Sequence, residues 1–175
     1  SRHDERRFAL RLLNTLLGEN MSSWLFQVLR EDRGLAYSIH SSLCFFDDVG
    51  ALVISAGLET GQLPRALKLI FRELRRFAEA VPSARELRQA RDYLIGQLDL
   101  GLESTDNRMT WLGDQLLGYG TIIPPAEIKR RLCEVTAAEI RRAAQEFFRP
   151  ERFSLALVSP VKASAAPELS RLIRL

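Results

Sequence analysis

The stretch GENMSSWLFQVLREDRGLAY, residues 18–37, decides how this chain folds. It is typical of a turn, a short helix, a glycine stop and the start of a strand. Ser22 or Ser23 is expected to cap the helix, because a serine hydroxyl can accept hydrogen bonds from the free amides of the first helical turn. Apolar residues then recur at helical spacing, at Leu25, Val28 and Leu29. The segment therefore predicts a short amphipathic helix.

Gly34 is expected to end this helix with a positive φ. Beyond it, a strand is predicted because apolar residues fall on alternate positions, at Tyr37, Ile39, Leu43 and Phe45. Arg30 stands late in the helix and Tyr37 stands just after the glycine. We therefore expect one long cation and one phenol to face a common space.

Length and composition indicate a soluble globular domain. A chain of 175 residues with 46% hydrophobic and 27% charged residues is expected to form one unit over 1–160, followed by a tail over 161–175 with a short helix. The net charge of +3 leaves nucleic-acid binding as a hypothesis. Against it, the arginines alternate with acidic residues along predicted helices, and no basic stripe interleaved with aromatic residues is present.

The remaining pattern predicts an α+β fold, with an antiparallel or mixed sheet covered by helices on one face. Strands are expected over 36–46, 51–58 and 153–159, and helices over 4–17, 62–79, 83–104, 106–119, 125–133, 136–148 and 167–175.

Several residues fix the details of these elements. Asp4 is expected to cap the first helix and Gly18 to end it, while Ser83-x-x-Glu86 and Thr136-x-x-Glu139 are capping boxes. Gly96 and Gly101 lie inside a predicted helix and indicate close helix packing. The second strand, ALVISAGL, is apolar on both faces, which favours a central strand between helices and a partner surface. Cys44 and Cys133 are expected to be buried thiols.

A resemblance extends over nearly the whole chain. SSWLFQVLREDRGLAYSI at 22–39, DDVG at 47–50, ELRQARDYLIGQLDLGLES at 86–104 and LALVSP at 155–160 resemble the second-half, non-metal-binding domain of the pitrilysin/insulinase-type zinc peptidases, in the processing-peptidase-like branch. The resemblance implies a half domain of the LuxS/metallohydrolase-like class. That domain normally opens with a strand, so we expect the first edge strand to be lacking here. A bared sheet edge is a pairing site, which also allows a homodimer.

The family's zinc site is not encoded in this chain. Its members hold zinc with an inverted His-x-x-Glu-His helix and a downstream glutamate, because two histidines one turn apart share a face and the glutamate can activate the metal-bound water. Only His3 and His40 are present, and neither belongs to such a motif. The resemblance therefore implies no metal and no cofactor on this chain, zinc on a partner domain, and no proteolysis by this chain alone.

Arg30 and Tyr37 match the family's arginine and tyrosine, seven residues apart. The resemblance implies that Tyr37 hydrogen-bonds to the scissile carbonyl as it becomes an oxyanion and that Arg30 holds substrate backbone carbonyl groups. From composition alone, Arg33 is an equal candidate to Arg30, and Tyr37 could equally be a half-buried packing residue.

The favoured hypothesis is a non-catalytic half of a zinc metallopeptidase. Its expected partners are a catalytic first-half domain, on the same or a companion polypeptide, and a peptide substrate. The alternative is a structural scaffold subunit of the same family with no peptidase role. No run of 18 apolar residues indicates a membrane span, and the compartment is left open between cytoplasm and periplasm.

Overall fold

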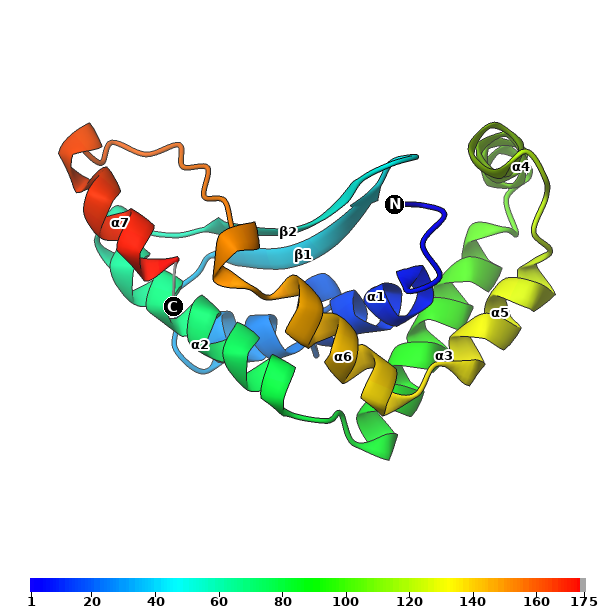
Figure 1. The fold of residues 1–175 in the computed structure, drawn as a ribbon, viewed down its shortest axis with the longest axis horizontal. Coiled ribbons are helices and arrows are strands. Elements are labelled where there is room, and N and C mark those ends of the chain that lie inside the picture. The colour runs from blue at the N-terminus through cyan, green and yellow to red at the C-terminus, as the bar shows by residue number, and fades with distance from the viewer. Residues whose placement is uncertain (174–175) are drawn as a thin grey trace.

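One antiparallel hairpin lies over a layer of helices, which confirms the predicted α+β class (Figure 1). In the computed structural model, which describes residues 1–173, β1 (Ser38–Phe45) pairs with β2 (Gly50–Gly57). The register runs from Ser38 opposite Gly57 to Phe45 opposite Gly50. The α-helices of the described residues are α1 (Arg7–Asn14), α2 (Leu63–Glu79), α3 (Ala84–Gly101), α4 (Thr105–Tyr119), α5 (Pro125–Glu134), α6 (Ala137–Phe147) and α7 (Ala166–Leu172).

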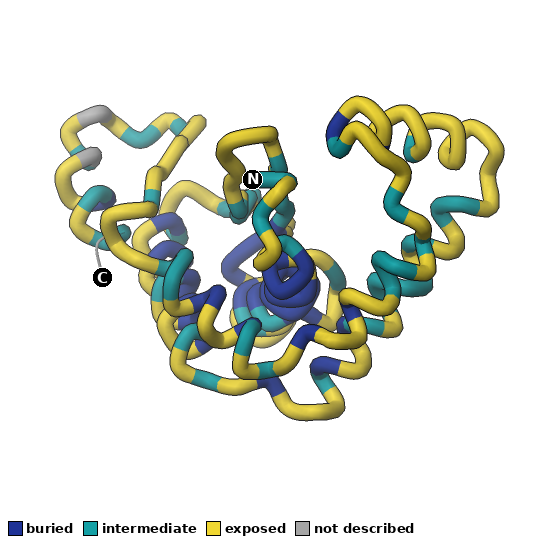
Figure 2. Tube along the Cα trace, turned by 45° about the vertical axis from the view of Figure 1, so that its right-hand side comes forward, coloured by how far each residue is buried: buried dark blue, intermediate teal, exposed yellow. Residues whose placement is uncertain are grey.

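Helix α1 forms the centre of the core and is the most deeply buried segment in Figure 2. The predicted Asp4 cap is wrong, because the helix begins only at Arg7 and no side chain caps it. Asp4 instead orders the turn before the helix, where its Oδ1 accepts from the backbone N–H of Arg6 at 2.8 Å. After α1 the chain continues in a π-helical turn, η1 (Thr15–Glu19).

Gly18 does not end the helix, which corrects the prediction. It lies inside η1, where a Cβ atom would stand 2.7 Å from Oγ and 2.9 Å from N of Ser41 on β1. The glycine is therefore needed for close approach between helix and strand, because no larger residue leaves room for Ser41.

Helix α2 follows the predicted pattern. Its basic residues Arg65, Lys68 and Arg72 are exposed, while the buried face consists of Leu67, Ile70, Leu74 and Phe77. Both predicted capping boxes are present, at Ser83 with Glu86 before α3 and at Thr136 with Glu139 before α6.

Two predictions about small residues are wrong. A Cβ atom at Gly96 or Gly101 would meet nothing within 4 Å, so neither glycine marks close helix packing. Cys44 and Cys133 are exposed free thiols rather than buried ones, because each stands on the solvent side of its element.

The predicted strand over 153–159 does not form. Its residues alternate as a strand does, but in the described structure they belong to no ladder, and β2 pairs only with β1. A cavity of about 370 Å³ lies between segment 153–159 and β2. It is lined by Ile54 and Ala56 of β2 and by Leu155 and Leu157 of the segment. β2 is therefore an edge strand of the described sheet, not the central strand that the sequence predicted.

Helix α7 packs on α2, where Leu169 is buried against Leu63 and Leu67. The predicted final helix included residues 174–175, which lie outside the described residues. The division between 1–160 and a tail stays a prediction. Within residues 1–173, no helix combines the length and the apolar character that crossing a membrane requires.

Candidate functional site

The turn before the Arg30 helix is built by Asn20. Its Oδ1 accepts hydrogen bonds from the backbone N–H of Ser22 at 2.9 Å and from the Ser22 hydroxyl at 2.7 Å. The Ser23 hydroxyl donates to the carbonyl oxygen of Asn20 at 2.5 Å. Neither serine is seen to accept from a first-turn amide, so the predicted serine cap is wrong and the asparagine side chain organises the turn.

The helix that carries Arg30 is π-helical over η2 (Phe26–Glu31). The N–H of Asp32 donates to the carbonyl of Gln27 at 2.8 Å, five residues earlier. Leu25 and Leu29, two members of the predicted apolar stripe, are fully buried. Wide turns of this kind often occur at functional sites. This one was not predicted, because the helical spacing of apolar residues is counted on α-helical geometry.

Trp24 fixes the start of this helix to the neighbouring layer. Its ring meets Phe77 of α2 edge to face with 4.7 Å between centroids, and Arg76 lies 5.0 Å above it. The indole N–H donates to the Glu86 carboxylate at 3.3 Å. These contacts anchor the segment to both α2 and α3.

Arg30 extends from the last turn of this helix into solvent, with 46% of its side chain exposed. Its guanidinium lies 5.0 Å from the ring centroid of Phe26, and its Nε is 4.0 Å from the Glu31 carboxylate. Such exposed contacts hold the side chain only loosely, so the guanidinium is free to accept another partner.

Gly34 ends the helix as predicted, with φ of +59°. The N–H of Leu35 donates back to the carbonyl of Leu29 at 2.8 Å, and Leu35 and Ala36 are buried. The N–H of Tyr37 then donates to the carbonyl of Gly57 at 2.8 Å, which ties its backbone to β2.

Tyr37 is 87% exposed, although its backbone is hydrogen-bonded to β2. It is therefore not a half-buried packing residue. Arg30 precedes Gly34 in the chain and Tyr37 follows it, and both are exposed to solvent. Within the described residues no hydrogen bond joins the two side chains.

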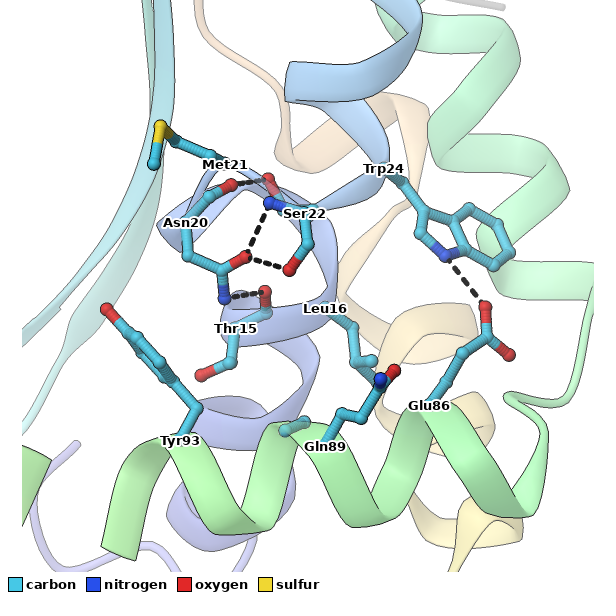
Figure 3. A pocket seen from close by; sticks show the side chains of 11 residues that line it. Thr15, Leu16, Asn20, Met21, Ser22, Trp24, Glu86, Gln89 and Tyr93 are labelled. Atoms are coloured by element: carbon cyan, nitrogen blue, oxygen red, sulfur yellow. Dashed lines mark hydrogen bonds between the residues drawn. The ribbon is translucent and has the colours of Figure 1, made fainter. Parts of the chain in front are cut away.

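A cavity of about 520 Å³ opens beside the Asn20 turn (Figure 3). Asn20 and Ser22 lie across it from Gln89 and Tyr93 of α3. Burial, and to a smaller degree the negative charge of Glu19, raise the pKa of Tyr93, so this phenol stays a neutral donor. Neither Arg30 nor Tyr37 lines this cavity.

The side chains present do not fit a zinc site. Over residues 1–173, no group of three or more His, Cys, Asp or Glu side chains could hold a metal ion. His40 lies exposed on β1, and His3 meets the ring of Tyr119 edge to face.

Residues 1–94 match the family model described as the peptidase M16 inactive domain. An uncharacterized zinc protease of Streptomyces coelicolor is 37% identical over 169 residues, covering 97% of this chain and 37% of the relative. The chain thus belongs to the peptidase M16 inactive-domain family.

Further similarities agree with this assignment. The uncharacterized zinc protease YmxG of Bacillus subtilis is 36% identical over 156 residues, covering 89% of this chain and 38% of YmxG. A peptidase M16 inactive domain from Pseudomonas fluorescens has the same fold, with a TM-score of 0.73 at 22% identity over 83% of this chain and 35% of that one. The chain spans little more than a third of the length of the curated relatives it matches.

Proposed function

We propose that this chain is the substrate-contacting, non-catalytic half of a zinc peptidase whose zinc ion is held by a partner domain. The Tyr37 hydroxyl donates a hydrogen bond to the scissile carbonyl oxygen as negative charge develops on it. The Arg30 guanidinium donates to backbone carbonyl groups of the same peptide, which holds the peptide in register. The partner's zinc supplies the Lewis acid.

The exposure of Tyr37 on a fixed backbone is the observation that carries this proposal. Its neighbours Leu35, Ala36 and Ile39 are buried, and its own N–H is bonded to Gly57. A phenol on such a backbone needs little further ordering before it meets a substrate, and pre-positioned donors are the effective ones in catalysis.

The family also supports a companion domain as the partner. Relatives named as zinc proteases are much longer than this chain, so a zinc-bearing half can stand on the same natural polypeptide. A companion polypeptide is the other arrangement. In both, the peptide substrate lies between the two halves.

The test combines the 175-residue chain with a first-half domain that carries a His-x-x-Glu-His motif and follows cleavage of a fluorogenic peptide. The chain alone is expected to be inactive and the mixture active. Tyr37→Phe removes only the hydroxyl and is expected to lower kcat by roughly 10²- to 10³-fold, the usual effect of losing one oxyanion donor.

A matched pair of arginine variants separates the two candidate cations. Arg30→Gln is expected to raise KM about tenfold, since a charged hydrogen bond to substrate is lost, while Arg33→Gln leaves KM unchanged. The reverse result would move the assignment to Arg33. An unchanged rate for Tyr37→Phe, together with no peptide binding by calorimetry, would instead identify a scaffold without a peptidase role.

A further inference from the structure

A cavity of about 460 Å³ lies at the end of β1 far from Tyr37, between α1, α3, α4 and α5. Arg7 and Arg11 of α1 line one part of it, and Trp111 and Gln115 of α4 line another. In Figure 1, α4 stands at the far end of α3. The cavity is thus built by elements distant in sequence, and its lining combines positive charge with apolar surface.

The positive charge comes from arginines without carboxylate partners. Arg7 and Arg11 are one helical turn apart, and neither forms an ion pair with a described residue. Each lies over an aromatic ring instead, with Cζ of Arg7 4.6 Å from the Phe8 centroid and Cζ of Arg11 5.8 Å from the Phe45 centroid. Arg7 also donates one hydrogen bond from Nη1 to the carbonyl oxygen of Asp4 at 3.1 Å, which leaves its other N–H groups for a ligand. Like charges at this spacing repel each other, so an anion at the cavity would relieve the repulsion.

The rest of the lining leaves this charge in excess. Arg2 adds a third guanidinium, which is ion-paired with Asp47 at 2.9 Å. Asp114 adds one carboxylate. The charge and the fixed aromatic contacts together favour an anion that arginine can bind through paired hydrogen bonds, such as a carboxylate.

Gln115 indicates that the ligand also carries a hydrogen-bond donor. The residue is only 9% exposed, and its Oε1 has no hydrogen-bond partner among the described residues. A buried acceptor without a donor is unfavourable and calls for an explanation. Because Gln115 lines the cavity, an N–H group on a bound ligand can supply the missing donor.

We propose that this cavity binds a peptide through a carboxylate. The carboxylate pairs with Arg7 and Arg11, a backbone N–H of the peptide donates to Oε1 of Gln115, and an apolar side chain rests on Trp111. A C-terminal carboxylate and an aspartate or glutamate side chain both offer this chemistry. The inference does not depend on the roles proposed for Arg30 and Tyr37.

Calorimetry of the 175-residue chain with three short N-acetylated peptides tests the proposal. The first ends in leucine with a free carboxylate, the second is its C-terminal amide, and the third is an amide with glutamate before the leucine. The first or the third is expected to bind, which identifies the source of the carboxylate, and the second is not. Equal binding of all three, or of none, would overturn the proposal.

Variants locate the site. Arg11→Gln is expected to weaken binding at least about tenfold, as loss of a charged hydrogen bond does, whereas the control Arg65→Gln on α2 leaves it unchanged. Gln115→Leu is expected to weaken binding several-fold without lowering the melting temperature, because the oxygen it removes has no partner. An equal effect of Arg65→Gln, or displacement of the peptide by inorganic phosphate at matched ionic strength, would show a non-specific anion effect and refute the site.

Discussion

Tyr37 shows how a single exposed residue can be held by buried neighbours. Leu35 and Ala36 pack into the core just before it, and the N–H of Tyr37 itself is bonded to Gly57. The backbone that carries the phenol is therefore held by the core on one side and by β2 on the other. Gly34 makes this arrangement possible, because its positive φ turns the chain from the Arg30 helix toward β1.

The same glycine-to-alanine change is expected to have opposite effects at two positions. Gly34 has φ of +59°, which an alanine adopts only with strain, so Gly34→Ala should lower the free energy of unfolding by about 1 kcal/mol. Gly96 lies inside α3 with nothing within 4 Å of an added Cβ, so Gly96→Ala should raise it by about 0.5–1 kcal/mol.

Urea unfolding of the two variants and of the unchanged chain gives both values. Gly61→Ala is the control for Gly34→Ala. That glycine has neither a positive φ nor a close neighbour, so an alanine there should not lower the free energy of unfolding. A stabilising Gly34→Ala would mean that the backbone turn after the Arg30 helix does not require a positive φ.

At the scale of elements, the capping box of α3 links stability to pH. Glu86 Oε2 accepts from the N–H of Ser83 at 2.8 Å, and its other oxygen accepts from Trp24. The Ser83 side chain is the largest influence that lowers the pKa of Glu86 below its ordinary 4.5, and the hydrogen bonds from the Ser83 backbone N–H and from Trp24 add to it. A lowered pKa in the folded state means that the carboxylate stabilises the fold above pH 4.5, and that this contribution is lost as pH falls below it.

Glu86→Gln keeps the shape of the capping box but removes its charge. At neutral pH it should lower the free energy of unfolding by about 0.5 kcal/mol, the usual contribution of an anion near a helix N-terminus. At a pH where Glu86 is protonated, the substitution should leave the free energy of unfolding unchanged. Chemical unfolding at neutral and acid pH measures the difference. Glu103→Gln is the control, and a deficit for Glu86→Gln that persists at acid pH would contradict the linkage.

Sequence reasoning placed the helices well because their patterns are local. The apolar period of α2 and the capping residues Ser83 and Thr136 each act within one or two turns. The strand over 153–159 failed for the opposite reason, since alternation along a segment says nothing about whether a neighbouring strand is within hydrogen-bonding reach.

At the candidate site too, features set by one residue could be predicted and features set by tertiary packing could not. Gly34 was foreseen because positive φ is a property of one residue. The cap was misassigned because Asn20, Ser22 and Ser23 can all cap a helix, and only tertiary packing chooses among them. The cavity with Gln115 was missed altogether, because α1 and α4 meet there from distant parts of the sequence.

At the scale of the whole molecule, the described sheet is open along β2. Backbone N–H and C=O groups on an unpaired edge are ready to bind another strand. Segment 153–159, which carries Leu155 and Leu157, lies across a cavity from that edge and forms no ladder with it. An extended segment between the two would find hydrogen-bonding groups on β2 and apolar side chains on both sides.

The open edge predicts that this chain associates with itself as its concentration rises. Sedimentation velocity over a wide concentration range should reveal a dimer in rapid exchange with the monomer.

Val53 is 40% exposed on β2, and Val53→Lys should shift the equilibrium toward the monomer, because a charged side chain on an edge strand disfavours strand pairing. Val49→Lys, in the turn before β2, introduces the same charge outside the strand and should leave the dimer intact. Equal loss of the dimer in both variants would indicate general charge repulsion, and a monomer at every concentration would mean that the edge does not pair with a second copy.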